Sequence, residues 1–191
     1  MDDLDSLLHA LLGGDDEHAE AVLDPLASYG TQALPRLLPL ATADLTDHRW
    51  WAMTALAMID APQARKALVE ALDDSDPAVR QAAALGLHHN PTPEAVPVLI
   101  EMLDDRDRLL ARLAGAALSA LGSEAISPLT LALRAEEPAV RIEAARALAS
   151  IDDPAVIPAL FAALSDPSTL VVHWAEEGLN RSGVGMVFFK P

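Results

Sequence analysis

The apolar residues of this chain recur with a period of about 31 positions. An alanine recurs at intervals of 31, 31, 30 and 31 residues, and a leucine follows each of these alanines four positions later. The two columns are Ala52, Ala83, Ala114, Ala144, Ala175 and Leu56, Leu87, Leu118, Leu148, Leu179. In the fourth copy, Val140 and Ile151 extend the spacing to i, i+4, i+8 and i+11, the apolar face of a helix. The pattern predicts first helices near 47–59, 77–89, 108–121, 138–151 and 168–181.

A second apolar ladder fills the other half of each period. Its leucines are Leu37, Leu68, Leu99, Leu129 and Leu160. In three copies a proline stands two positions before the leucine, at Pro35, Pro97 and Pro158. Proline is tolerated in the first turn of a helix but breaks its interior, so these helices begin just upstream. The ladder predicts second helices near 31–42, 62–73, 93–104, 124–134 and 154–165.

Pairs of helices at a fixed period predict an all-α fold, an α-solenoid of about five two-helix repeats. We expect residues 1–191 to form one such solenoid, with regular repeats over 47–182 and a tail at 183–191. Residues 1–46 are expected to hold an N-terminal cap helix at 2–12 and a degenerate repeat. The helix predicted at 16–29 contains Pro25 in the leucine column, which should kink it.

The loop motifs add a family resemblance. Asp-Pro-Ala-Val-Arg at 76–80 and Glu-Pro-Ala-Val-Arg at 137–141 precede an alanine-rich helix and a proline-led leucine helix. This arrangement resembles the HEAT-like repeats of the phycobilisome lyase type. The resemblance implies a right-handed superhelix with the second helices on its concave face. It also implies that the arginines of one column, Arg49, Arg80 and Arg141, pair with inter-repeat acids, with Asp76, Asp107 and Glu137 as candidates.

The charge balance narrows the range of partners. The formal net charge is −16, from 29 acidic and 13 basic residues, which disfavours binding to nucleic acid or to anionic membranes. An acidic surface either serves solubility or docks a basic protein partner. The chain has no cysteine and no apolar run long enough to span a bilayer, and its first residues are acidic. We therefore expect a cytoplasmic location.

The sequence offers no recognisable catalytic constellation. The six histidines lack the His-Glu-x-x-His spacing of zinc proteases, and no glycine-rich phosphate loop is present. We expect no cofactor, no metal and no catalytic residue. The leading hypothesis is a non-catalytic interaction scaffold. The alternative, which rests on the repeat type alone, is a bilin lyase or a phycobilisome-related chaperone subunit.

The aromatic residues are the best candidates for partner contacts. At about 100° per residue, Trp50 points away from the apolar face of its helix, whereas Trp51 and Trp174 lie in a boundary column. Met53 is on the same helix and is expected to widen this patch. These side chains either cover gaps at atypical end repeats or anchor a partner, since tryptophan is enriched in interface hot spots.

The tail carries two further aromatic residues, Phe188 and Phe189. Two interpretations fit them. In the first, the tail folds back and the two rings cover the last hairpin. In the second, the tail inserts into a neighbouring copy and makes a homo-oligomer.

Overall fold

The computed structural model describes residues 3–184, and every regular element within them is helical. The chain forms two compact units, residues 1–92 and 93–191, here called unit 1 and unit 2 and described separately. The all-α fold of repeated helical hairpins is therefore confirmed. The single solenoid over residues 1–191, with its expected cap, regular repeats and tail, stays a prediction. No helix of residues 3–184 has the length and apolarity needed to cross a membrane.

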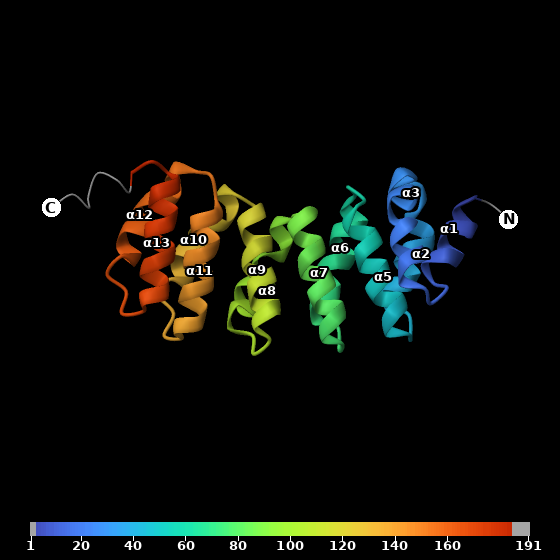
Figure 1. Ribbon diagram of the computed structural model, residues 1–191, viewed down its shortest axis with the longest axis horizontal. Coiled ribbons are helices and arrows are strands. Elements are labelled where there is room, and N and C mark those ends of the chain that lie inside the picture. Colours follow the sequence, from blue (N-terminus) through green and yellow to red (C-terminus); the bar gives the residue numbers. More distant parts are fainter. Residues whose placement is uncertain (1–2, 185–191) are drawn as a thin grey trace. The chain divides into compact units, whose positions relative to one another are not determined.

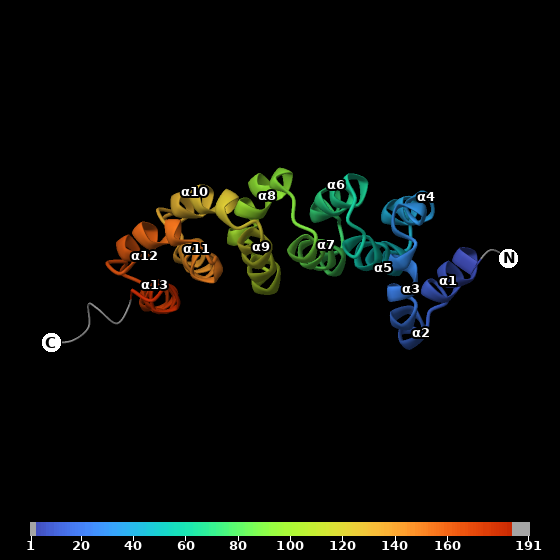
Figure 2. The same cartoon turned by 90° about the horizontal axis from the view of Figure 1, so that it is seen from above.

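Unit 1 contains three short N-terminal helices followed by hairpins (Figure 1). The short helices are α1 (Asp3–Leu11), α2 (Asp16–Ala21) and α3 (Leu23–Ser28), followed by a 3-10 turn at Gly30–Gln32. The hairpin helices are α4 (Leu34–Leu37, continued as a 3-10 helix over Leu38–Thr42), α5 (Thr46–Ala57), α6 (Pro62–Glu70, continued over Ala71–Asp73) and α7 (Pro77–His89). Seen from above, α4 and α6 lie in one layer and α5 and α7 in the other (Figure 2).

Unit 2 repeats the same two layers. One layer holds α8 (Val96–Glu101, with 3-10 turns at Pro93–Ala95 and Met102–Asp104), α10 (Ser123–Ala132) and α12 (Ile157–Ala163, preceded by a 3-10 turn at Pro154–Val156). The other holds α9 (Arg108–Ala120), α11 (Pro138–Ser150) and α13 (Thr169–Arg181). Figure 2 shows these layers on opposite sides of the unit.

The predicted helices agree with the observed ones to within a few residues, with one informative exception. The helix expected over 16–29 is divided at Val22 into α2 and α3. Pro25 has no N–H to donate to the carbonyl of Ala21, so a continuous helix would lose a hydrogen bond there. The expected kink is therefore a break, which lets α2 and α3 take separate directions.

Adjacent helices approach closely through a column of small residues: Ala55, Gly86, Ala117, Ala147 and Gly178. A Cβ atom added at Gly178 would lie 2.9 Å from the backbone Cα of Ala149 and 2.7 Å from Leu160 Cδ1. A contact under 3.0 Å with backbone cannot be relieved by a side-chain rotation, so this position requires glycine. Each small residue is followed directly by a leucine of the leucine column, and these leucines are fully buried, as at Leu87 and Leu118.

One repeat is a residue shorter than the others, and the structure shows where the difference is absorbed. Only Leu121 and Gly122 connect α9 to α10, whereas three residues connect α11 to the 3-10 turn at Pro154. Gly122 adopts φ +62°, a left-handed conformation that other residues rarely take. The shortened hairpin turn thus leaves the junction between successive repeats unchanged.

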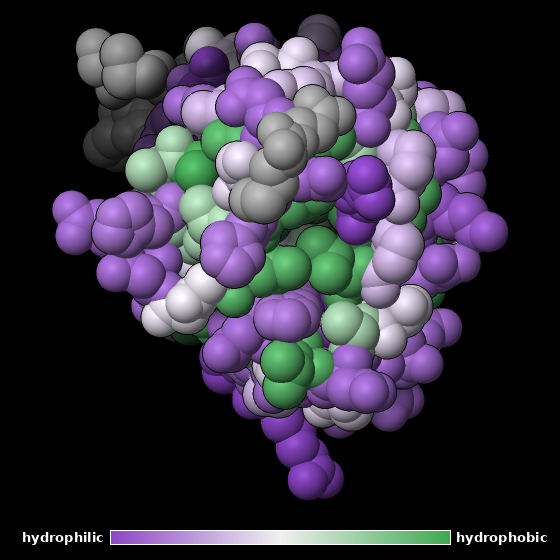
Figure 3. Space-filling view, turned by 90° about the vertical axis from the view of Figure 1, so that its right-hand side faces the viewer, coloured by the Kyte–Doolittle hydropathy of each residue, from purple (hydrophilic) through white to green (hydrophobic). Residues whose placement is uncertain are grey.

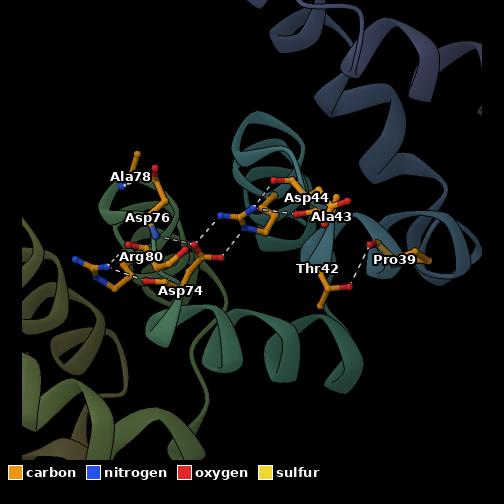
Figure 4. A network of polar contacts seen from close by, with 10 residues as sticks. Pro39, Thr42, Ala43, Asp44, Asp74, Asp76, Ala78 and Arg80 are labelled. Carbon is orange, nitrogen blue, oxygen red and sulfur yellow. Dashed lines mark hydrogen bonds and ion pairs between the residues drawn. The ribbon is translucent and has the colours of Figure 1, made fainter.

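Successive repeats within each unit are tied by an arginine and an aspartate 25 residues apart, an arrangement we call the clamp. In unit 1 the Arg49 guanidinium donates from Nε to Asp74 Oδ2 at 2.7 Å and from Nη2 to Asp74 Oδ1 at 3.0 Å. Its Nη1 donates to the carbonyl oxygens of Ala43 and Asp44. Figure 4 shows Asp74 beside Asp76, whose backbone N–H donates to Asp74 Oδ1.

Unit 2 contains the same clamp. Arg141 donates from Nε to Asp166 Oδ2 at 2.8 Å and from Nη1 to the carbonyls of Ala135 and Glu136, and Asp166 accepts the N–H of Ser168. The structural role implied for the arginine column is confirmed at Arg49 and Arg141.

The implied partners of these arginines were wrong. Asp76 accepts the N–H of Ala78 as the N-cap of α7, and Asp107 accepts the N–H groups of Leu109 and Leu110 as the N-cap of α9. Glu137 occupies the N-cap position of α11. Because the cap residue turns its side chain toward its own helix, the aspartate two positions earlier is the one that faces the preceding repeat.

The clamp alters the acidity of its carboxyl groups. The hydrogen bonds from Arg49 hold the pKa of Asp74 below its usual value against the opposing effect of burial, and Arg141 does the same for Asp166. A hydrogen-bonded, partly buried carboxylate is favoured in its ionised form.

The buried leucine column yields a first prediction. Leu118 is fully buried, so replacing it with alanine should lower the free energy of unfolding by roughly 2–5 kcal/mol through lost burial and the cavity left behind. The matched control is Leu109→Ala on the same helix, where the side chain is 52% exposed. Urea unfolding followed by circular dichroism measures both. Equal effects of the two changes would show that Leu118 has no special place in the core.

The clamp yields a second prediction, on pH. A carboxyl whose pKa is lower in the folded than in the unfolded chain stabilises the fold above about pH 4, and this contribution is lost as the pH falls through the folded pKa. The variant with both Asp74→Asn and Asp166→Asn should therefore be less stable near pH 7 and lose less stability on acidification than the parent. Unfolding free energies measured at a series of pH values test this. An equally steep acid loss in both proteins would contradict it.

Candidate protein-binding site

The side chain of Trp50 is a partly exposed aromatic group of unit 1. Trp50 and Trp51 occupy the second turn of α5, and their rings meet edge to face with centroids 4.6 Å apart. Trp51 is only 7% exposed, so the ring of Trp50 packs against a buried indole. The sequence-based orientation of Trp50 away from the core agrees with its partial exposure.

Trp50 borders a hollow of about 390 Å³, here called the Trp50 hollow. Its lining residues are Asp16, Glu20, Thr46, Asp47, Trp50, Trp51 and Ala78. A second hollow of about 500 Å³ adjoins it and shares Asp16, Thr46, Asp47 and Trp51. The connection between α1 and α2 and the exposed Leu45 complete the second hollow. Together they place the exposed leucine close to the aromatic surface of Trp50.

Three carboxylates surround the indole, and local structure explains their position. Gly14, at φ +76°, turns the chain after α1, and Asp15 caps α2 by accepting the N–H of His18 at 3.0 Å. This hydrogen bond holds the pKa of Asp15 below its usual value. Asp16 and Glu20 then lie one turn apart on α2 and reach the hollow, while Asp47 comes from the first turn of α5. The hollow therefore has a negative wall.

The neighbouring end of unit 1 is also amphipathic. Seen from this end, hydrophobic side chains gather in the middle of the face and hydrophilic ones surround them (Figure 3). On α1, Leu4 and Leu11 are buried, while Leu7 and Leu8 remain half-buried. The apolar surface at this end is therefore only partly covered by the described chain.

Met53 does not belong to this exposed surface, contrary to the expectation that it would widen the patch. Its side chain is fully buried, because α5 is packed against α3 on one side and α7 on the other. Equivalent positions in later repeats hold Ala84 and Ala145, which are also fully buried. The column that contains Met53 faces a neighbouring helix.

The remaining predicted aromatic residues are not part of the Trp50 hollow. Trp174 lies in unit 2, where it is half-buried against Ala145, Val171 and Ala175. The Arg146 guanidinium lies over its ring at 4.9 Å from the centroid. Phe188 and Phe189 lie outside the described residues, so their packing stays a prediction.

A polar cluster in unit 2 escaped the sequence-based reasoning. Glu143 is 5% exposed and occupies the boundary column in which the other residues are Trp51, Ala82, Leu113 and Trp174. Its Oε2 accepts a hydrogen bond from Arg146 Nη1 at 2.8 Å, and its Oε1 lies 3.6 Å from Arg108 Nη2. A lone glutamate in an otherwise apolar column was the available signal.

The described residues hold little that suggests chemistry. Among residues 3–184 no group of three or more His, Asp or Glu side chains is placed to bind a metal ion. His88 and His89 are both exposed at the end of α7. The Trp50 hollow supplies an aromatic face and carboxylates, groups suited to holding a cation.

Solved structures with related folds are numerous. The E. coli protein YibA superposes with a TM-score of 0.61 at 21% identity, covering 98% of this chain and 73% of that protein. The complex of CpcE and CpcF of phycocyanin lyase from Nostoc sp. PCC7120 gives a TM-score of 0.57 at 22% identity, covering 92% of this chain and 75% of that one. A designed armadillo repeat protein in complex with the peptide (KR)4 gives 0.55 at 22% identity, covering 93% and 98%. At these identities the likeness shows the fold alone.

The sequence itself identifies the family. No curated protein matches the chain at a significant level. A family model for HEAT repeats matches residues 4–87, 66–136 and 97–180, which together span nearly all of the described residues. The repeat period, the buried leucine and alanine columns and the hairpin layers agree with this match, and the chain belongs to the HEAT-repeat family.

Proposed function

We propose that this protein is a non-catalytic interaction scaffold and that a basic segment of a partner protein docks at the Trp50 hollow. The observation that supports this proposal is the combination of one partly exposed indole with three carboxylates from two helices. An arginine or lysine side chain over an indole gains a cation–π interaction, and carboxylates at its rim stabilise the same charge. A cytoplasmic location is part of the same proposal.

Two further features support a protein partner. Trp51 holds the indole of Trp50 at its edge, so the aromatic surface is ordered before binding and little entropy is lost. The adjoining hollow contains the apolar Leu45, which is 60% exposed and contacts an aliphatic residue of the same segment in this proposal. An apolar contact beside a cation site is typical of protein interfaces. Self-association through the tail, with Phe188 and Phe189, remains a separate prediction.

The alternative is a bilin lyase or phycobilisome-related chaperone subunit. It is supported by the repeat type, whereas the likeness to CpcE and CpcF concerns the fold. A bilin-binding protein should change the visible absorbance of an added open-chain tetrapyrrole. The scaffold proposal expects no such change on mixing.

The proposal predicts binding of a short synthetic peptide of alternating lysine and arginine, measured by calorimetry. Trp50→Ala should weaken this binding by about two- to thirtyfold, because the cation–π contribution amounts to roughly 0.5–2 kcal/mol. Glu20→Gln should weaken it as well, and added salt should reduce the affinity of the parent.

The matched control is Glu124→Gln, which removes an exposed carboxylate from the first turn of α10 in unit 2. This variant should bind the basic peptide like the parent. Equal affinities of Trp50→Ala and the parent for the basic peptide, or equal weakening by Glu20→Gln and Glu124→Gln, would contradict the proposed site.

A further inference from the structure

Unit 2 presents a concentration of positive charge in a strongly acidic protein. Arg108 and Arg112 lie one turn apart on α9, and Arg146 comes from the adjacent α11. Glu143 contacts two of them, Arg108 and Arg146. We call these three arginines the arginine cluster.

Some hydrogen-bond donors of the arginine cluster have no acceptor among the described residues. Arg112 is exposed and makes no hydrogen bond or ion pair with residues 3–184. The Nε of Arg146 is buried and has no acceptor among these residues. At the position of α13 equivalent to Arg146 stands Glu177, and no ion pair joins it to Arg146 or Arg112 in the same range. Unsatisfied guanidinium donors favour an added oxyanion.

The geometry of the cluster is held in advance of binding. Arg146 is fixed from two sides, by its hydrogen bond to Glu143 and by the face of Trp174. Burial lowers the pKa of Arg146, Glu143 opposes this effect, and the charges of Arg112 and Arg108 add to it. Glu143 contacts both Arg146 and Arg108, so it holds two arginines of the cluster in place.

An exposed apolar side chain next to the arginine cluster indicates what kind of anion fits. Leu109 is 52% exposed and lies three residues before Arg112, on the same side of α9. Nucleic acid would be repelled by a chain of net charge −16. A protein segment that carries both carboxylates and aliphatic groups satisfies the arginines and Leu109 together.

We propose that the arginine cluster of unit 2 is a second binding site, which takes the carboxylate side chains of an acidic, leucine-containing segment of a partner protein. Arg112 and Arg146 bind the carboxylate, Arg108 and Glu143 position Arg146, and Leu109 contacts an aliphatic residue of the segment. The site differs in charge from the Trp50 hollow, so a scaffold with both would hold a basic and an acidic partner segment.

The test uses a synthetic peptide of glutamate and leucine and its glutamine-for-glutamate counterpart, with binding measured by calorimetry on the full chain. The parent should bind the first peptide and not the second. Arg112→Gln should weaken binding about tenfold through the loss of a charge-assisted hydrogen bond. Arg134→Gln, which removes an exposed arginine from the turn after α10, should leave it unchanged. Because Arg112 is exposed, its replacement should not alter thermal unfolding.

Four results would overturn the proposal. The parent could fail to bind the acidic peptide, or Arg112→Gln could match Arg134→Gln. Displacement of the peptide by an equal concentration of inorganic phosphate would identify a site for small anions. Concentration-dependent association in sedimentation, lost in Arg112→Gln and accompanied by no peptide binding, would show that the occupant is a second copy of this chain.

Discussion

The fold depends on the close approach of neighbouring helices, because one two-helix hairpin cannot bury its apolar face by itself. Each hairpin of a unit covers the face of the next, and the contact is tight enough that Gly178 has no room for a Cβ atom. The clamps from Arg49 to Asp74 and from Arg141 to Asp166 then fix the spacing between loops. Helix packing and the charged pairs therefore both constrain the distance between neighbouring hairpins.

The period and the prolines were sufficient to predict the hairpins, since both are consequences of helix geometry that appear directly in the sequence. The partner of Arg49 could not be obtained in this way. The loop contains Asp73, Asp74 and Asp76 within four positions, and the choice among them depends on backbone direction. The break at Val22 was also only partly predictable, because Pro25 excludes a continuous helix without deciding where the chain turns.

The candidate site was less predictable than the fold. The direction of Trp50 follows from its angle on one helix, but the hollow requires α2 and α5 to meet, which no single helix specifies. Met53 was misplaced for the same reason, since a helix with neighbours on two sides buries more than one face. Glu143 shows the converse case, in which a polar residue in an apolar column is stabilised by arginines from two helices.

The short turn at Gly122 has a consequence for how the chain length can vary. The clamp spans 25 residues from the start of one first helix to the loop before the next, and both described pairs keep this distance. The missing residue in the 30-residue repeat falls in the turn within a hairpin. Additional sequence, such as a fluorescent reporter or a foreign epitope, inserted at Gly122 would project from one edge of unit 2, and the registration of successive hairpins would survive the insertion.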